Sequence, residues 1–226
     1  MGGIFKFTMS NITDYLFEKG KGIIERKPEV TDGRYEMADD GGVELCVGEL
    51  LYGLIRAIKP QAVLSTGIYT GVSDMYIGQA LLDNGFGTSD ALEFEPKHIE
   101  RAKKLWMQVG VDKVINEHLT SSLEFTPNRN YDFMFLDTEP QIRLHELVKF
   151  FPYLNLGGYF GIHDLHRHMG QNVYNPDHPD MPHWPWGEIP QQIKQWVRED
   201  KLRVIHFPSP RGLTFMYKTN PEDYKW

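Results

Sequence analysis

Two glycines that follow an apolar run are the first residues of this chain that could hold a ligand. Gly67 and Gly71 come after Val63-Leu64-Ser65-Thr66, and Ser73 stands where a helix would begin. This order predicts a buried strand, a tight turn and a helix N-terminus, where α/β proteins bind nucleotide-like ligands. The Gly-x-x-x-Gly spacing differs from the Gly-x-Gly-x-x-Gly pattern, which argues against NAD.

An acidic residue follows at the distance expected for a ribose ligand. Glu93 lies 26 residues beyond Gly67, at the end of the run Ala91-Leu92. A carboxylate there can accept hydrogen bonds from both hydroxyls of a ribose. Together with the glycine spacing, it favours S-adenosylmethionine as the bound nucleoside. The alternative is an acid that complements the dipole of the next helix, a role that suits Glu95 better.

Two aspartates end apolar runs further along the chain. Asp137 follows Phe133-Met134-Phe135-Leu136, and Asp164 closely follows Phe160-Gly161-Ile162. At the carboxyl ends of neighbouring parallel strands they would share one edge of the sheet with the glycine turn. Two carboxylates there repel each other unless a cation or protons lie between them, and Mg²⁺ prefers such ligands. The alternative is that they cap the following helices.

Histidines gather beside the second aspartate. Six of the nine histidines fall between residues 145 and 183, and His163 and His166 flank Asp164. Strand alternation turns His163 away from Asp164 unless the strand has already ended, so His166 is preferred as metal ligand or catalytic base. Imidazole suits Zn²⁺ or Fe²⁺ better than Mg²⁺, so those metals stay open.

Alternating strand and helix patterns predict the elements that carry these residues. The chain is expected to form an α/β, Rossmann-like, mostly parallel seven-stranded sheet with helices on both faces and a C-terminal antiparallel strand pair. Strands are predicted at 62–66, 91–95, 113–117, 131–137, 158–163, 202–207 and 213–218. Helices are predicted at 11–27, 43–58, 73–84, 97–109, 142–153 and 188–199.

The predicted elements divide the chain into two parts. Residues 1–42 form an N-terminal helical and loop extension, and residues 43–226 form the ligand-binding domain. Within the domain, 164–187 is a long irregular segment rich in proline, histidine and tryptophan, which indicates a lid. Its Tyr174, Trp184 and Trp186 would either line the site or face another subunit.

Composition narrows the partners and the compartment. The net charge of −7 argues against a nonspecific grip on nucleic acid. We find neither an apolar run of about 18 residues nor a secretory signal. The single cysteine, Cys46, lies between apolar neighbours and is predicted to be buried and structural. We therefore expect a cytoplasmic homo-oligomer that binds a small molecule and neither nucleic acid nor a membrane.

The ordered set of motifs resembles a known family. Gly67-x-Tyr69-x-Gly71-x-Ser73, Glu93, Asp137 and His163-Asp164 resemble the class I S-adenosylmethionine-dependent methyltransferases, specifically the metal-dependent small-molecule O-methyltransferases related to the catechol and caffeoyl-CoA enzymes. The likeness runs from about residue 43 to 218. It implies methyl transfer from S-adenosylmethionine to a hydroxyl group, assisted by a divalent metal, with Mg²⁺ expected first.

The resemblance also implies roles for individual residues. Cofactor contacts would come from the glycine turn with Tyr69 and Ser73, from Glu93 at the ribose, and from residues near the adenine. The full set implied for the cofactor is Gly67, Tyr69, Gly71, Ser73, Glu93, Phe94, Ser121 and Ser122. Metal ligands would be Asp137, Asp164 and His166, and catalysis would use Asp137 with His166 or His163.

Three departures from the family pattern bear on the chemistry. Ser65 stands where the family has an acid, Pro140 where catechol-type members have a lysine, and Leu165 where they have an asparagine. The chain is therefore more similar to the branch with macrolide-sugar O-methyltransferases and cephalosporin hydroxylase-like proteins. Two alternatives stay open: an Fe²⁺-dependent hydroxylase on the same fold, and a noncatalytic cofactor-binding module.

Overall fold

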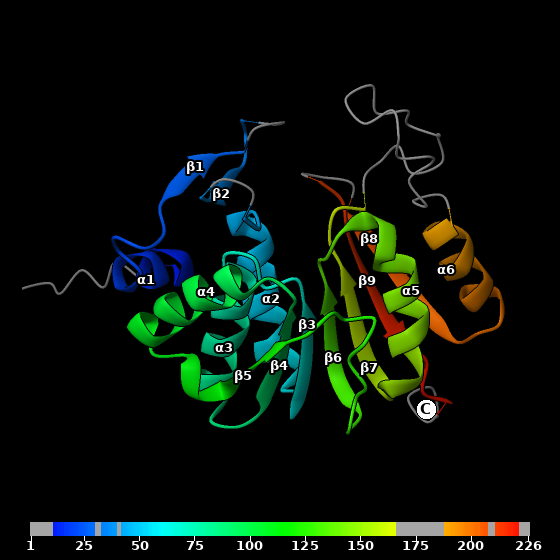
Figure 1. Cartoon of the computed structure of the whole chain (residues 1–226). Coiled ribbons are helices and arrows are strands. Elements are labelled where there is room, and N and C mark those ends of the chain that lie inside the picture. The colour runs from blue at the N-terminus through cyan, green and yellow to red at the C-terminus, as the bar shows by residue number, and fades with distance from the viewer. Residues whose placement is uncertain (1–10, 30–32, 40–41, 166–187, 208–210, 222–226) are drawn as a thin grey trace, which may run out of the picture.

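One seven-stranded sheet forms the centre of the molecule. The computed structural model describes residues 11–29, 33–39, 42–165, 188–207 and 211–221. The strands lie in the order β5-β4-β3-β6-β7-β9-β8 (Figure 1). The strands from β3 to β7 run parallel, whereas β9 is antiparallel to both of its neighbours. The strands are β3 Ala62–Thr66, β4 Thr88–Glu93, β5 Ile115–Leu119, β6 Tyr131–Leu136, β7 Leu154–Ile162, β8 Leu202–Phe207 and β9 Leu213–Lys218.

Helices cover both faces of this sheet. Val63 and Leu64 are adjacent in β3 but belong to two different buried clusters, because successive strand residues point to opposite faces. The cluster with Val63 includes side chains of α1 to α4, and the cluster with Leu64 includes side chains of α5 and α6. The helices are α1 Ile12–Lys19, α2 Leu45–Ile58, α3 Val72–Asn84, α4 Pro96–Val109, α5 Pro140–Phe150 and α6 Glu188–Arg198, with short 3₁₀ turns at Asp112–Val114 and Phe151–Tyr153.

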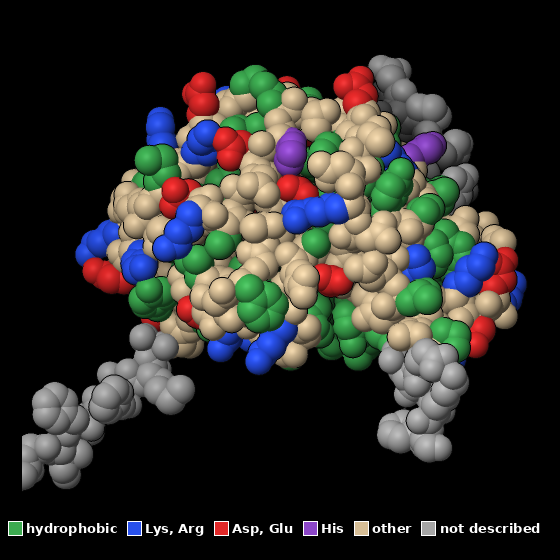
Figure 2. All heavy atoms as spheres, turned by 90° about the horizontal axis from the view of Figure 1, so that it is seen from below, with side chains coloured by type: hydrophobic (Ala, Val, Ile, Leu, Met, Phe, Trp, Pro, Cys, Tyr) green, Lys and Arg blue, Asp and Glu red, His purple; other side chains and the backbone are tan. Residues whose placement is uncertain are grey.

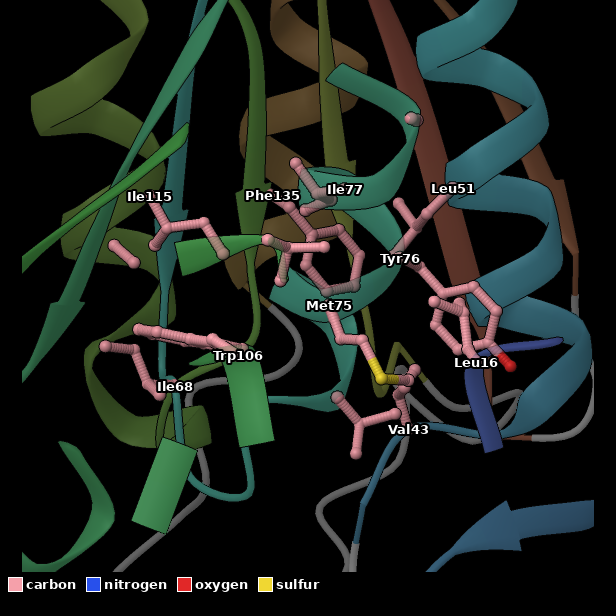
Figure 3. Packing of buried hydrophobic residues seen from close by; sticks show 14 of the residues in the cluster. Leu16, Val43, Leu51, Ile68, Met75, Tyr76, Ile77, Trp106, Ile115 and Phe135 are labelled. Carbon is pink, nitrogen blue, oxygen red and sulfur yellow. The ribbon is translucent and has the colours of Figure 1, made fainter. Parts of the chain in front are cut away.

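The larger cluster fixes the start of α3, which borders the predicted site. Trp106 of α4 and Met75 of α3 lie in one packed group with Leu51 of α2 and Phe135 of β6 (Figure 3). Trp106 is 1% exposed, and its Nε1 donates a hydrogen bond of 2.8 Å to the carbonyl of Gly71. The glycine turn is therefore held between its own helix and α4.

The N-terminal segment differs from the prediction. The expected helix over 11–27 ends at Lys19, because Gly20 caps it through a hydrogen bond to the carbonyl of Leu16. The chain then forms a hairpin of β1 Arg26–Pro28 and β2 Glu36–Ala38. Strands of three residues are too short for an alternating pattern to reveal. Leu16 is fully buried in the larger cluster, so α1 packs on the domain.

Most other boundaries lie close to those predicted, with strand starts the main exception. The strand expected at 91–95 begins at Thr88, because its polar first half pairs with Ala62 and its neighbours in β3. The strand expected at 158–163 begins at Leu154. Cys46 is exposed, which corrects the expected burial, since it lies on the outer side of α2.

The surface gives two further findings about possible partners. In Figure 2, which views the molecule from below, basic and acidic side chains are interspersed, so that face carries no continuous basic patch. Among the described residues, we find no helix with both the length and the apolar character needed to cross a bilayer.

Candidate functional site

A cavity of about 360 Å³ opens at the carboxyl ends of the parallel strands. The chain proceeds from β3 outward through β4 to β5, then returns to place β6 on the other side of β3. Ligands of such sheets bind at this reversal of strand order. The cavity is lined by Gly42, Val43, Gly67, Ile68, Tyr69, Thr70, Ser73, Leu92, Glu93, Phe94, His98, Thr120, Ser121, Ser122, Asp137, Thr138, Glu139, Ile142, Asp164 and Arg211.

Gly67 lines the cavity at a point where no other residue fits. Its φ of +81° lies in the left-handed region, and a Cβ built there would lie 2.2 Å from the backbone oxygen of Asp137. Asp137 also donates its backbone N–H to the carbonyl of Thr66, at 3.1 Å. The glycine turn and the loop after β6 therefore touch through their backbones, which brings the ends of β3 and β6 together.

Gly71 is not among the residues that line the cavity, and it packs against α4. It precedes α3 with a φ of +78°, and a Cβ there would lie 2.6 Å from the Cβ of Ala102. This glycine lets α3 and α4 pack closely. The other seven residues implied for the cofactor all line the cavity.

Glu93 lies at the end of β4 and is held by backbone amides. Its carboxylate accepts hydrogen bonds from the N–H groups of Tyr69 at 3.0 Å, Phe94 at 2.9 Å and Glu95 at 3.0 Å. The side chain is 6% exposed, and His98 Nδ1 lies 3.5 Å away. The two turns that follow β3 and β4 thus meet on one carboxylate, which faces the cavity.

Aromatic and hydroxyl side chains line the rest of this side. Phe94 is 60% exposed and gives the cavity a flat apolar edge. Tyr69 packs edge-on against His98 with ring centroids 5.0 Å apart. Ser73 is in the first turn of α3, and Ser121 and Ser122 follow β5. These groups can hold a flat ring and a polar chain side by side.

On the opposite side, Asp137 and Asp164 lie with His163 in one cluster. One ligand atom from each lies within 4.8 Å of the others. His163 Nδ1 is 3.2 Å from both carboxylate oxygens of Asp137 and 3.6 Å from Oδ1 of Asp164. His163 reaches this edge because β7 ends at Ile162 and Asp164 takes a φ of +57°. The alternation that set His163 aside therefore does not apply, while His166 lies outside the described residues.

Residues that the sequence did not point to complete this cluster. The buried Glu44, just before α2, accepts a hydrogen bond of 2.8 Å from His163 Nε2. Arg211 donates from Nε to Glu44 and from Nη2 to the carbonyl of Gly42, at 2.9 Å, and its Nε lies 3.3 Å from Asp164. The signal that could have found Glu44 is an acid between apolar residues at a helix start.

A buried arginine of α5 also contacts this cluster. Arg143 of α5 is 1% exposed and donates to the carbonyls of His163 and Thr138, while its Nη2 lies 3.6 Å from Asp137. The signal that could have found it is a basic residue directly between two apolar ones, Ile142 and Leu144. Arg143 ties together the two loops that carry the aspartates.

The charges in this cluster shift one another's protonation. Burial alone would lower the pKa of His163, but the charges and hydrogen bonds of Asp137, Glu44 and Asp164 raise it to about 10. Burial would raise the pKa of Asp137, yet His163 holds it below the usual value. With carboxylate oxygens near both ring nitrogens, this arrangement favours the protonated form of His163.

The donor set of this cluster fits a divalent cation. Two carboxylates and one imidazole converge, and Oδ1 of Asp164 is buried with no hydrogen-bond partner among the described residues. Glu44 fixes the ring of His163 through Nε2 and leaves Nδ1 toward the carboxylates, which is how outer-shell acids orient histidine ligands. Arg143 and Arg211 already supply part of the neutralising charge.

Comparison with protein-family models identifies the segment that contains this site. Residues 64–165 match the model of a methyltransferase domain. That segment starts within β3 and ends just after Asp164, so it includes the glycine turn, Glu93 and both aspartates.

A curated relative and two solved structures extend the comparison. The "Putative O-methyltransferase" of Mycolicibacterium smegmatis is 30% identical over 135 residues, which cover 57% of this chain and 63% of the relative. The O-methyltransferase TomG of Streptomyces achromogenes, solved with SAM, superposes with a TM-score of 0.65 at 19% identity, over 80% of this chain and 83% of TomG. A Bacillus cereus O-methyltransferase solved with SAH gives 0.65 at 15% identity, over 80% and 84%.

The chain spans less than two thirds of the length of that curated relative. The solved structures share the fold at low identity. Together with the matched domain they define the fold class: a Rossmann-like, mostly parallel seven-stranded sheet with a C-terminal antiparallel pair.

Proposed function

We propose that the chain is a class I S-adenosylmethionine-dependent methyltransferase that transfers the methyl group to a hydroxyl oxygen of a small molecule, an interpretation supported by the matched methyltransferase domain. One observation carries the proposal. The glycine turn, Ser73 and Glu93 line one side of a single cavity, and Asp137 and Asp164 line the other. A cofactor bound along the first side would present its sulfonium toward the second, where an acceptor oxygen needs to be activated.

The first side of the cavity supplies groups that match the parts of S-adenosylmethionine. Glu93 would accept hydrogen bonds from the ribose hydroxyls, and the exposed ring of Phe94 would lie against the adenine. Ser73, at the N-terminus of α3, would bind the carboxylate of the methionine part, since helix N-termini favour anions. The relatives TomG and the Bacillus cereus enzyme, solved with SAM and SAH, support this choice of cofactor.

The second side would hold a divalent cation through Asp137, His163 and Asp164. Such a cation, when bound, lowers the pKa of an acceptor hydroxyl toward neutrality. A histidine ligand must be neutral, so binding would release the His163 proton. An imidazole in the donor set favours Mn²⁺, Fe²⁺ or Zn²⁺ over the Mg²⁺ expected first. Glu44 would keep the ring oriented, and Arg211 would hold Asp164 in place.

A second candidate function rests on the same donor set. The cluster has three protein ligands, as does the facial triad of non-haem Fe²⁺ oxygenases, which leaves coordination positions open for oxygen and substrate. That triad has two histidines and one carboxylate, whereas this cluster has one histidine and two carboxylates. Because the cluster includes His163, it fits Fe²⁺ better than a cluster of carboxylates alone would. The matched domain and the named relatives favour methyl transfer.

Methyl transfer itself provides the test. The chain would be incubated with S-adenosylmethionine labelled in the methyl group and a panel of phenols, sugars and hydroxy acids, with Mg²⁺, Mn²⁺, Fe²⁺ or a chelator. We expect label in an ether product and release of S-adenosylhomocysteine, both reduced by the chelator. Products that gain oxygen instead of a methyl group would replace the proposal with the hydroxylase.

A further inference from the structure

A buried carboxylate behind the cavity wall has no partner for its charge. Asp74, in the first turn of α3, is 1% exposed. Its Oδ1 accepts a hydrogen bond from the hydroxyl of Ser65 in β3, whereas Oδ2 is buried with no hydrogen-bond partner among the described residues. In that part of the chain, no lysine, arginine or histidine forms an ion pair with Asp74. An acid in this environment needs an explanation, because burying it unpaired is costly.

The surroundings of Asp74 add to this cost. Burial raises the pKa of Asp74 to about 7 against the effect of the Ser65 hydrogen bond, and the negative charges of Asp137 and Glu93 raise it further. Both of those acids line the cavity. The dipole of α3 favours an acid in the first turn, but that contribution is about 1 kcal/mol and leaves Oδ2 without a partner. Asp137 and Glu93 each have a histidine within 4.0 Å, whereas Asp74 has no basic side chain within that distance among the described residues.

Asp74 lies behind the residues that line the cavity rather than among them. Ser73, the residue before it, lines the cavity, and Ser65 lies two residues before Gly67, which also lines it. The carboxylate thus lies between the end of β3 and the start of α3, at the side assigned above to the methionine part of the cofactor. S-adenosylmethionine carries a positive α-ammonium group in that part.

We propose that Asp74 is the carboxylate that pairs with the α-ammonium group of S-adenosylmethionine, with Ser65 holding it in place. The inference rests on the proposed function, because it requires that cofactor. The ligand would supply both the missing hydrogen-bond donor for Oδ2 and the missing positive charge. Asp74 is thereby a binding residue for the cofactor, and Ser65 a positioning residue that acts through it.

Two ligands that differ in the amino-acid part test this inference. S-adenosylhomocysteine has the α-ammonium group, and 5′-methylthioadenosine has the same nucleoside and thioether without it. Both would be titrated calorimetrically into the full chain and into Asp74→Asn. We expect Asp74→Asn to weaken S-adenosylhomocysteine by about 10-fold or more and 5′-methylthioadenosine by less than about 2-fold, since a hydrogen bond to a charged group is worth about 1.5–3 kcal/mol.

Further variants separate this role from a structural one. Glu93→Gln is expected to weaken both ligands, because both contain the ribose. Moving the carboxylate to the neighbouring strand, with Ser65→Asp and Asp74→Ala combined, is expected to restore part of the preference for S-adenosylhomocysteine. Should Asp74→Asn fail to fold, Asp74→Thr gives the same comparison of ligands.

The outcomes distinguish this inference from the proposed function. If the unaltered chain binds S-adenosylhomocysteine and Asp74→Asn binds it equally well, or loses both ligands to the same extent, Asp74 does not pair with the ammonium group while the cofactor assignment stands. If the unaltered chain binds neither ligand, the proposed function fails and this inference fails with it.

Discussion

The two sides of the cavity hold their acidic side chains in opposite ways. Beside β6 and β7, three acids lie within 4.0 Å of a basic side chain, in the pairs Glu44–Arg211, Asp137–His163 and Asp164–Arg211. Beside β3 and β4, Glu93 is held mainly by backbone N–H groups, and Asp74 has no ion pair among the described residues.

This difference indicates which side of the cavity would bind a positively charged ligand. Backbone amides and an unpaired acid leave the β3–β4 side ready for a molecule that brings its own cations, as S-adenosylmethionine does. Basic side chains already balance the acids of the β6–β7 side, and a metal ion bound there would displace the proton of His163. Cofactor binding and metal binding should therefore respond to different substitutions.

The largest effect on stability is expected at Gly67, where the turn after β3 touches the loop after β6. In Gly67→Ala the new Cβ would lie 2.2 Å from a backbone oxygen, at a φ of +81°, so neither atom can give way easily. We expect a loss of more than about 3 kcal/mol in the free energy of unfolding, measured with urea. Gly85→Ala is the matched control, with a φ of +80° and no atom within 4 Å, and should cost about 1 kcal/mol. Equal losses would contradict the close contact.

Removal of a proposed metal ligand should weaken metal binding without changing cofactor binding. Asp164→Asn takes away a carboxylate whose Oδ1 lacks a hydrogen-bond partner in the described residues. We expect calorimetric affinity for Mn²⁺ to fall about 100-fold or more, while affinity for S-adenosylhomocysteine changes little. Asp112→Asn, at an exposed position before β5, serves as the control. Unchanged Mn²⁺ binding in Asp164→Asn would rule out this cluster as the metal site.

The unpaired acid should give a pH dependence of stability. The pKa of Asp74 is about 7 in the folded chain and near 3.8 when unfolded, so the folded state holds this proton more tightly. Stability from this proton is complete at pH values below about 4 and is lost as the pH rises through 7. Relative to Asp74→Asn, the unaltered chain should lose about 3 kcal/mol between pH 4.5 and 8. Urea unfolding of Asp83→Asn, in the same helix, provides the comparison, and a difference independent of pH would contradict this protonation.

The smallest effect concerns the ribose. Glu93→Gln keeps the side-chain shape but exchanges a charged acceptor for an amide, and we expect about 10-fold weaker binding of S-adenosylhomocysteine. Glu95→Gln, two residues away and outside the cavity lining, should change binding by less than about 2-fold. The reverse order would move the ribose site to Glu95.

Sequence analysis predicted the β3–β4 side of the site, because that side is built from turns local in the sequence. The strand at 62–66 has the predicted bounds, and its glycine turn lines the cavity through residues close in the chain. On the β6–β7 side, the contacts between residues far apart in the chain were not predicted. Glu44 meets His163 across 119 residues and Arg211 across 167, and no local pattern encodes such contacts.

Local conformation explains the remaining differences. Alternation turns His163 away from Asp164 only while the strand continues, and the strand ends before His163, with Asp164 in a left-handed conformation. Polar residues at the start of β4 hid the beginning of that strand, which is fixed by pairing with β3. The role of Gly71 in helix packing depends on Ala102, which only the folded chain brings near.

Calorimetric titration of the chain with S-adenosylhomocysteine, with NAD in parallel, tests the cofactor assignment most directly. We predict saturable binding of S-adenosylhomocysteine at one site per chain, competition by S-adenosylmethionine, and no binding of NAD. Heat no greater than that of the buffer control with S-adenosylhomocysteine, or saturable binding of NAD instead, would contradict the assignment.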